Sequence, residues 1–461
     1  MALLRRRAKC LETHFAFAVI MFGFSVDSLA PARLLLRPRS LLFPFVFLSI
    51  ALFLILPFRA HAYGVLAHEA LIDAAWDTSI LPLLLERFPN ATREELRHAH
   101  AHAYGGAIIQ DLGYYPHGSH TFSNLLHYVR AGDFVKALLR DAQDLNEYAF
   151  ALGALAHYAA DNEGHRIAVN RAVPLLYPHL GRRYGNVVTY EDDPGAHLKT
   201  EFGFDVLEVA KERFAPDSYH EFIGFEVARP LLERAFQDTY SIPLRVVYDD
   251  LDKAVGSYRY SVRAVIPKAT KVAWALKGDE IKQDLPDMTR KKFLYNLSRS
   301  SYERDWGKDY KRPNFAERFL AFVFRLIPKV GPLKALTFRT PTPETEKLFE
   351  ASFNASLDEY KRLLNEERGG RLELPNRNFD TGQPEPPGAY FTTDFTYARL
   401  VDLLARQQFK QISVAMREDI LEYYRDQNAP NATKKKSKDW ARLTQELAEL
   451  KSLALTSQNA Q

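Results

Sequence analysis

Cysteine is nearly absent from this chain of 461 residues, since Cys10 is its only one. An intrachain disulfide is therefore impossible, and so is a zinc or iron–sulfur site built from several cysteines. Excess charge of one sign is also missing, because 61 Lys and Arg face 57 Asp and Glu and leave a net charge of +4. Charge alone thus indicates no dedicated surface for nucleic acid or anionic lipid. Any metal site must use His, Asp and Glu.

Long apolar runs are scarce, and 47% apolar with 26% charged residues is an ordinary globular composition that excludes a multi-span membrane protein. The exception is the segment 41–57, LLFPFVFLSIALFLILP, which follows two arginines and precedes Ala60-His61-Ala62. A basic region, an apolar region and an A-x-A signal predict a signal peptide cleaved after Ala62. We therefore expect residues 1–62 to be an export segment and the protein to be periplasmic or secreted. An uncleaved membrane anchor is the alternative, because 17 residues can barely span a bilayer.

Histidine is missing from the second half of the chain. Thirteen of the 14 histidines fall between His61 and His220, and none occurs in the 241 residues after that. Histidine titrates near neutral pH and is the commonest metal ligand. We therefore expect chemistry in the first half and a supporting role for the second.

Helical periodicity runs through most of the remaining chain and predicts an all-α fold. Apolar residues recur at helical spacing over residues 64–86, 92–110, 119–130, 133–161, 222–240, 244–276 and 291–302, with another helix starting near Ala196. Pro- and Gly-rich stretches at 328–343 and 375–388 predict loops. Helices are expected to resume at 397–406, 414–425 and 440–453.

This pattern predicts four parts. After the export segment come a catalytic domain at 63–305, a helical extension with loops at 306–430, and a basic, partly disordered tail at 431–461. Within the tail, the run from Lys434 to Lys438 is expected to be solvated. The apolar, basic stretch 318–338 is expected to pack against the bundle, or else to lie on a membrane surface.

Two histidine–carboxylate pairs occur at helical i, i+4 spacing, His157 with Asp161 and His197 with Glu201. Residues four apart share one face of a helix, so each pair can bind one ion. A single pair is common by chance, but two pairs favour a metal site. His157 also lies in a very apolar stretch, where an unpartnered imidazole is costly to bury.

With these pairs, the segment 63–205 resembles the bacterial zinc-dependent phospholipase C family, which shares its all-helical bundle with the single-strand-specific zinc nucleases. The matching motifs, in order, are Tyr63-Gly64-x-x-Ala67-His68, Gly106-Ala107-x-x-x-Asp111, His127-Tyr128, Leu155-Ala156-His157-Tyr158-x-x-Asp161, His165, and His197-x-x-x-Glu201.

The resemblance implies up to three zinc ions. The first would be bound by Asp111, His127, His157 and Asp161, and the second by His165, His197 and Glu201. The third would be bound by His68, Asp161 and the backbone amine and carbonyl of Tyr63. A backbone amine is a ligand only at a free chain terminus, so cleavage after Ala62 would be part of building the site.

Such a cluster implies phosphodiester hydrolysis, because zinc lowers the pKa of a bound water to about 7 and supplies hydroxide at neutral pH. Asp111 is the candidate catalytic residue that orients or deprotonates this water. The expected substrate is a phospholipid, cleaved to diacylglycerol and a phosphorylated head group, or another phosphodiester, and membrane-surface contact would accompany it. No obligate protein partner is indicated. A nuclease acting on single-stranded nucleic acid and a non-catalytic metal- or lipid-binding envelope protein are the alternatives.

Several histidines have competing interpretations. His117 and His120 are rivals of His127, and continuation of the helix past Asp161 would give His165 a structural role. The cluster His98, His100 and His102 falls in a helical stretch, where residues two apart point to different faces. We expect these three to be surface or supporting residues, and His179 and His220 to be structural. The aromatic residues Tyr104, Tyr114, Tyr115 and Phe122 are expected in the core, with the wall of a substrate cleft as the alternative.

Overall fold

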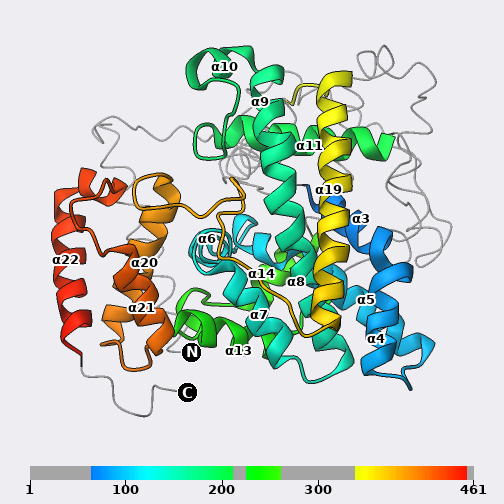
Figure 1. The fold of residues 1–461 in the computed structure, drawn as a ribbon, viewed down its shortest axis with the longest axis horizontal. Coiled ribbons are helices and arrows are strands. Elements are labelled where there is room, and N and C mark those ends of the chain that lie inside the picture. Colours follow the sequence, from blue (N-terminus) through cyan, green and yellow to red (C-terminus); the bar gives the residue numbers. More distant parts are fainter. Residues whose placement is uncertain (1–63, 211–224, 261–337, 454–461) are drawn as a thin grey trace, which may run out of the picture. The chain divides into compact units, whose positions relative to one another are not determined.

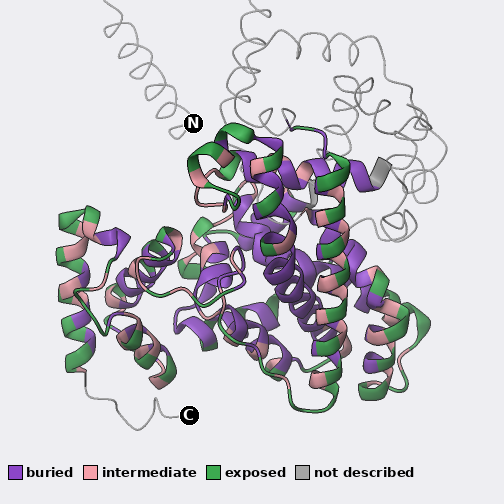
Figure 2. Cartoon of the chain, turned by 45° about the horizontal axis from the view of Figure 1, so that its top comes forward, coloured by how far each residue is buried: buried purple, intermediate pink, exposed green. Residues whose placement is uncertain are grey.

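The longest apolar helix of the first half, α8 (Leu145–Gly164), lies at the centre of the fold (Figure 1). The computed structural model describes residues 64–210, 225–260 and 338–453. In α8 every residue from Glu147 onward is buried (Figure 2). A helix that is apolar on all sides must be enclosed by other elements, and here other helices enclose it.

The all-α prediction is confirmed for the residues that the structure describes, where the only strand-like pairing is an isolated bridge between Asn378 and Gln383. The first helices are α3 (Val65–Ala75), α4 (Leu81–Arg87), α5 (Arg93–Ile108), α6 (His120–Tyr128) and α7 (Ala131–Asp141). After α8 come α9 (Asn170–Leu176), α10 (Pro178–Tyr184), α11 (Pro194–Ala210), α13 (Arg229–Tyr240), α14 (Leu251–Tyr260), α19 (Pro343–Arg368), α20 (Phe391–Arg406), α21 (Val414–Tyr423) and α22 (Ser437–Ser452). Short 3₁₀ turns are η2 (Ile109–Tyr114), η4 (Leu244–Val246) and η7 (Ala432–Lys435), and π-helical turns are η1 (Trp76–Ile80) and η3 (His165–Val169).

Two glycines allow α5 and α8 to cross with their backbones in contact. A Cβ atom at Gly106 would lie 1.9 Å from the carbonyl oxygen of Phe150, and one at Gly153 would lie 2.0 Å from that of Ala103. Any side chain at either position would push the helices apart. This contact brings the Ala107 carbonyl of α5 to the imidazole of His157 on α8.

The single helix predicted over 133–161 is wrong, because the chain breaks between α7 and α8. Asp144 ends the break as the N-cap of α8, with its carboxylate accepting a hydrogen bond from the Glu147 N–H at 2.9 Å. An N-cap satisfies a backbone donor that has no partner inside the helix, and this local preference outweighs the continuous apolar pattern.

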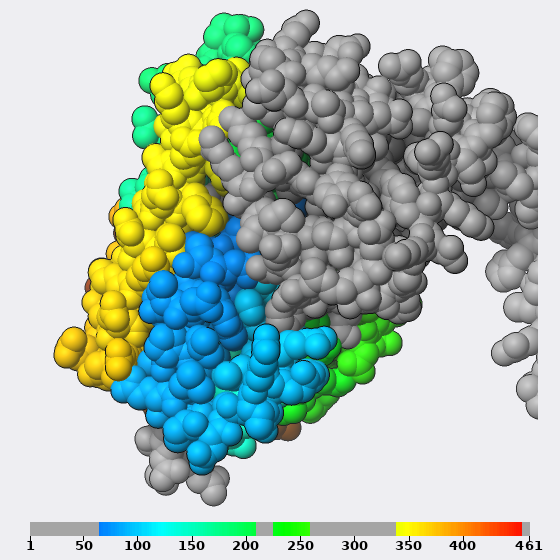
Figure 3. Space-filling view, turned by 90° about the vertical axis from the view of Figure 1, so that its right-hand side faces the viewer, coloured from blue at the N-terminus to red at the C-terminus, as the bar shows by residue number. Residues whose placement is uncertain are grey.

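The helix α19 is absent from the sequence-based prediction, which had helices resuming only at 397. It begins at Pro343 behind a capping box between Thr342 and Thr345, and it packs along α8. The Tyr360 hydroxyl donates to the Leu152 carbonyl at 2.9 Å. Figure 3 shows α19 against the α3–α4 segment, where Arg368 pairs with Glu86 at 2.7 Å. Small buried serines between its apolar residues made its periodicity weak.

The helices α20 to α22 form the end of the described chain, and α22 confirms the helix expected at 440–453. The expectation of a solvated basic run is wrong for Lys434, whose ammonium donates to the carbonyls of Gln427 and Ala429. The neighbouring Lys435 lies 3.9 Å from the centre of the Phe391 ring. This cation–π contact ties the run to α20.

Several predicted features lie outside the described residues: the export segment 1–62, Tyr63, His220, the helix at 291–302 and the stretch 318–337. Across the described ranges, no helix is both long and apolar enough to cross a membrane.

Candidate metal centre

The helix α8 carries His157 and Asp161 four residues apart, and the adjoining π-helical turn η3 begins four residues later at His165. All three side chains are buried. Four-residue spacing places them on one face of the helix. The helix does continue past Asp161, but the His165 side chain lies near Asp161 and does not have only a structural role in the core.

The hydrogen bonds of two imidazoles set their tautomers. His157 Nδ1 donates to the Ala107 carbonyl at 2.9 Å, and His127 Nδ1 donates to the Ser123 carbonyl at 2.7 Å. A neutral imidazole that donates at Nδ1 has a lone pair at Nε2. The two Nε2 atoms lie 3.4 Å apart and face each other, so two acceptors converge on one point.

Two carboxylates complete this first group. Asp111 Oδ1 lies 3.3 Å from His127 Nε2, and Asp161 Oδ2 lies 3.4 Å from His127 Nε2 and 3.1 Å from His157 Nε2. None of the four oxygens of Asp111 and Asp161 accepts a hydrogen bond from the described residues. Zinc with bonds of about 2.0–2.2 Å has tetrahedral ligand separations of about 3.3–3.6 Å. The donor set and its spacing therefore fit zinc.

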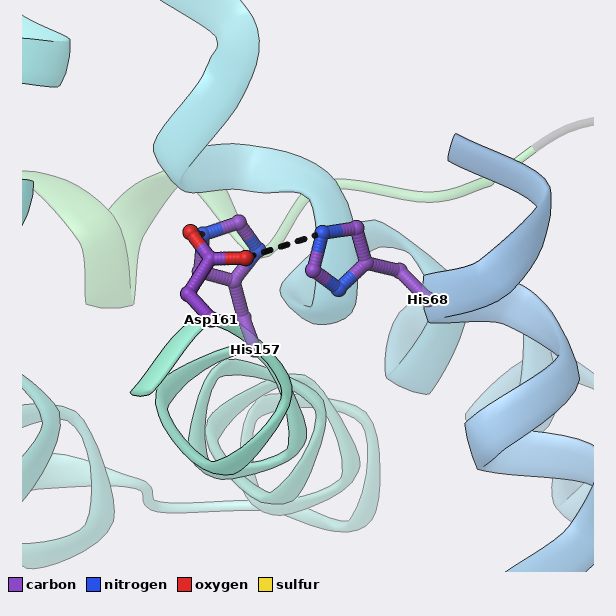
Figure 4. A group of neighbouring side chains, drawn as sticks. All are labelled: His68, His157 and Asp161. Carbon is purple, nitrogen blue, oxygen red and sulfur yellow. Dashed lines mark ion pairs between the residues drawn. The ribbon is translucent and has the colours of Figure 1, made fainter. Parts of the chain in front are cut away.

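His68 from α3 reaches the other oxygen of the same aspartate (Figure 4). Its Nε2 lies 3.4 Å from Asp161 Oδ1, and its ring stacks on that of His157 with centroids 4.3 Å apart. Asp161 thus faces the first group with Oδ2 and His68 with Oδ1. This is the arrangement of a bridging carboxylate, which the predicted first and third zinc sites both require.

A second group comes from η3 and α11. The rings of His165 and His197 stack with centroids 5.0 Å apart, and His197 Nδ1 lies 2.8 Å from Glu201 Oε1. His165 Nε2 lies 3.5 Å from Asp161 Oδ1. The ligand atoms of His165, His197 and Glu201 are all within 4.8 Å of one another. The structure therefore brings together every predicted metal residue that it describes.

The rival histidines lie elsewhere. His117 and His120 are exposed, whereas His127 is buried in the first group. In α5, His98 is exposed beside Glu94, and His100 stacks on Trp76 with centroids 3.7 Å apart. None of these side chains belongs to the three candidate metal groups found among the described residues.

Burial and opposite charges act against each other on the ionisable groups. Burial raises the pKa of Asp111 to about 6, with His157 and His127 opposing it. For Asp161, burial also favours the protonated form, but His157 and His165 outweigh it and hold the pKa well below its usual range. The two aspartates raise the pKa of His127 to about 9 despite its burial. A positive charge is therefore favoured between these carboxylates.

Sequence reasoning missed one side chain at this centre, Asp380, which lies in the predicted loop between α19 and α20. Its Oδ1 lies 3.2 Å from His165 Nδ1 and 3.3 Å from His197 Nε2. The predicted loop 375–388 is thus largely irregular, as expected, but it is not solvated at this residue. An aspartate in a Pro- and Gly-rich stretch is usually exposed, so no local signal pointed to the site.

A small, partly open cavity lies at the centre. Its lining residues are Tyr114, His127, Tyr128, Asp161, His165, Tyr190 and Asp380. Tyr114 is therefore a cavity residue, whereas Tyr104 and Phe122 are buried in the core as expected.

Comparison with known proteins gives one family. Residues 67–250 match the family described as zinc dependent phospholipase C. No curated protein matches the chain, and neither does any solved structure. The matched residues include every member of the two groups and His68, but not Asp380. Residues 67–250 of this chain are therefore similar to the zinc-dependent phospholipase C family.

Proposed function

We propose that this protein is a zinc-dependent phospholipase C, which hydrolyses phospholipids to diacylglycerol and a phosphorylated head group. The observation that carries the proposal is the convergence of Asp111, His127, His157 and Asp161 on one buried point without donors to satisfy them. A buried group of acceptors is costly unless a cation neutralises it.

The residues that would hold zinc fall into the groups already described. The first site would use Asp111, His127, His157 and Asp161, the second His165, His197 and Glu201, and the third His68 and Asp161 with the terminal amine of Tyr63. Bound zinc would lower the pKa of a water to about 7 and offset the charge that develops on the phosphoryl oxygens.

The side chains of this protein would orient the reactants. Asp111 lies against His127, and its carboxylate would hold the attacking water and accept its proton. Burial raises the pKa of Tyr114 and of Tyr128 well above the usual value. In the metal-free protein both phenols are therefore neutral and add no negative charge to the cavity.

A nuclease acting on single-stranded nucleic acid is the second candidate, because three tyrosines, Tyr114, Tyr128 and Tyr190, line the cavity. Aromatic side chains beside a phosphodiester site can stack on nucleobases. The similarity of residues 67–250 to phospholipase C favours the lipid substrate over a strand of nucleotides.

The test is release of phosphocholine from phosphatidylcholine vesicles by the chain that starts at Tyr63, with and without a zinc chelator. A single-stranded oligonucleotide is the parallel substrate, and His98→Ala is the control for loss of an exposed histidine. Chelator-sensitive phosphocholine release that His98→Ala retains would support the proposal. Oligonucleotide cleavage alone would favour the nuclease, and zinc content without either activity would favour a binding protein.

We also propose that the protein is exported by cleavage after Ala62, since zinc binding by the Tyr63 amine requires a free terminus. Mass spectrometry of the protein recovered from the periplasm and medium should give Tyr63 as the first residue. A chain that keeps extra residues before Tyr63 should bind one zinc ion fewer, and equal zinc content in both forms would contradict the ligand role of the amine.

A further inference from the structure

The segment from Leu374 to Tyr390, between α19 and α20, crosses the metal centre although it lies outside the family match. The Phe379 N–H donates to the carbonyl of His127 at 3.1 Å, and the Tyr158 hydroxyl donates to the carbonyl of Pro375 at 2.8 Å. These bonds join the segment to α6 and α8, which carry His127, His157 and Asp161 of the first group. The segment is therefore held at a fixed place over the site.

Asp380 is the point where this segment enters the second group, and its two oxygens have different surroundings. Oδ2 accepts hydrogen bonds from the Tyr190 N–H at 2.9 Å and from the Tyr390 hydroxyl at 2.8 Å. Oδ1 faces the rings of His165 and His197 at 3.2 and 3.3 Å. The bonds to Oδ2 thus fix the carboxylate with its other oxygen toward both imidazoles.

Each of these imidazoles lies between two carboxylates. His165 has Asp380 at its Nδ1 and Asp161 at its Nε2, and His197 has Asp380 at its Nε2 and Glu201 at its Nδ1. The edges that face Asp161 and Glu201 lead into the zinc cluster. Asp380 faces the other ring nitrogen of each imidazole.

Asn170 on α9 decides which edge of His197 carries the proton. Its Nδ2 donates to the Asp380 backbone carbonyl at 2.7 Å, so its Oδ1 must accept, and it lies 2.8 Å from His197 Nε2. His197 therefore donates at Nε2, which leaves the lone pair at Nδ1 beside Glu201. Asp380, near the same Nε2, favours the same tautomer.

We propose that Asp380 is a positioning residue for the second zinc ion, acting from behind the imidazoles of His165 and His197. A carboxylate behind a zinc-bound histidine fixes the ring and its tautomer and makes the facing nitrogen a better ligand. The histidine-free second half of the chain thus contributes to the metal centre through one side chain. The inference rests on the zinc-binding part of the proposed function and is independent of the substrate.

The test is zinc affinity and stoichiometry without substrate, measured for the full chain starting at Tyr63 and for Asp380→Ala and Asp380→Asn. Loss of a carboxylate behind a ligand weakens metal binding by about 10- to 100-fold. We expect this loss for one ion in Asp380→Ala and a smaller loss in Asp380→Asn, whose amide oxygen can still accept. Unchanged zinc affinity in Asp380→Ala would overturn the proposal.

Asn376→Ala is the matched control, because Asn376 anchors the same segment through Asp133 and touches no residue of the zinc groups. It should keep the zinc affinity of the unsubstituted protein. A loss equal to that of Asp380→Ala would overturn the proposal by showing that the segment acts only as packing.

A spectrum separates positioning from direct ligation. At Co²⁺ saturation, the visible absorption bands of Asp380→Asn should match those of the unsubstituted protein, because the ligands are unchanged. Altered bands would make Asp380 itself a ligand and overturn the positioning role.

Tyr390→Phe tests the inference if Asp380→Ala does not fold, as judged by its helical circular dichroism. It removes the hydroxyl that donates to Asp380 Oδ2 and should weaken the same ion by roughly threefold to tenfold. If the unsubstituted protein binds no zinc, the proposed function fails. If it binds zinc and neither Tyr390→Phe nor Asp380→Ala changes the affinity, only this inference fails.

Discussion

The region matched by the family, residues 67–250, and the C-terminal region, residues 338–453, hold their functional side chains in different ways. In the first, His157 and Asp161 on α8 and His197 and Glu201 on α11 follow helical spacing, so the backbone helix itself sets their positions. In the second, Asp380 lies in an irregular segment and is held by individual hydrogen bonds. A regular helix can carry several ligands, whereas a loop delivers one group and needs anchors around it.

The C-terminal region otherwise supports the first. The long helix α19 packs along α8, and its Tyr360 hydroxyl donates to the Leu152 carbonyl, which precedes the turns that carry His157 and Asp161. The difference between the regions is thus one of role: the proposed metal ligands in one, packing and a single proposed orienting carboxylate in the other. The predictions below test this division.

The largest effect should come from His157→Ala, which removes a ligand atom of the first group. We expect loss of zinc-dependent turnover and of the first zinc ion, while the helical circular-dichroism signal is largely kept. Zinc content by atomic spectroscopy and phosphocholine release are the measurements. Full activity in this variant would contradict the assignment of His157 as a zinc ligand.

The next effect should come from Gly153→Ala, because its Cβ would lie 2.0 Å from the backbone oxygen of Ala103. We expect a loss of about 1–3 kcal/mol in the free energy of unfolding from overpacking. Urea denaturation measures this free energy. Gly256→Ala in α14 is the control, since nothing lies within 4 Å of its Cβ. That exposed helical position should gain about 0.5–1 kcal/mol instead, and equal losses in both variants would contradict the α5–α8 contact.

The next effect concerns the pH dependence of the free energy of unfolding, to which Asp419 in the C-terminal region should contribute. Burial raises the pKa of Asp419 to about 6, while Arg130 and the Tyr397 hydroxyl oppose it. Its usual value is about 3.9, so the folded chain binds this proton more tightly than the unfolded chain. The resulting stability is present below about pH 4 and is lost as the pH rises through 6. Asp419→Asn should reduce this decline by about 1–2 kcal/mol, as seen by urea denaturation at pH 4.5 and 7. If the unsubstituted protein and Asp419→Asn lose the same stability between pH 4.5 and 7, the loss comes from other ionisable groups.

The smallest effect should come from Tyr360→Phe, which removes the bond between α19 and the Leu152 carbonyl. We expect a loss of about 1 kcal/mol in the free energy of unfolding, with zinc stoichiometry unchanged. A changed zinc content would show that α19 contributes more than packing, and the division between the two regions would then fail.

Helices in which apolar residues recur strongly at helical spacing could be predicted from the sequence. The four-residue spacing of His157 and Asp161 also predicted that these two side chains would lie close together. The break between α7 and α8 could not be predicted, because it depends on the N-cap at Asp144. The apolar pattern continues across the break and gives no sign of this local effect. The helix α19 was missed because Ser352 and Ser356 occupy buried positions on its inner face. Such residues pack well against another helix but carry no apolar signal.

Site residues that lie far from their partners along the chain were the hardest to predict. His127 could be preferred over His117 and His120 because it lies in an amphipathic stretch, and the structure places it in the centre. Asp380 had no comparable pattern, because its partners His165 and His197 lie far away in sequence. Contacts of this kind arise from tertiary packing and leave no periodicity.

The order of these residues along the chain also bears on when the centre can form. His68 is made early, but Asp380 is made only after α19, so a growing chain holds several of the proposed zinc ligands long before the carboxylate proposed to orient two of them. Closing so long a loop costs entropy that only later contacts recover, which slows this step relative to local helix formation. Tight binding at the second ion would then mark a late stage of folding, reached only after α19 has been made.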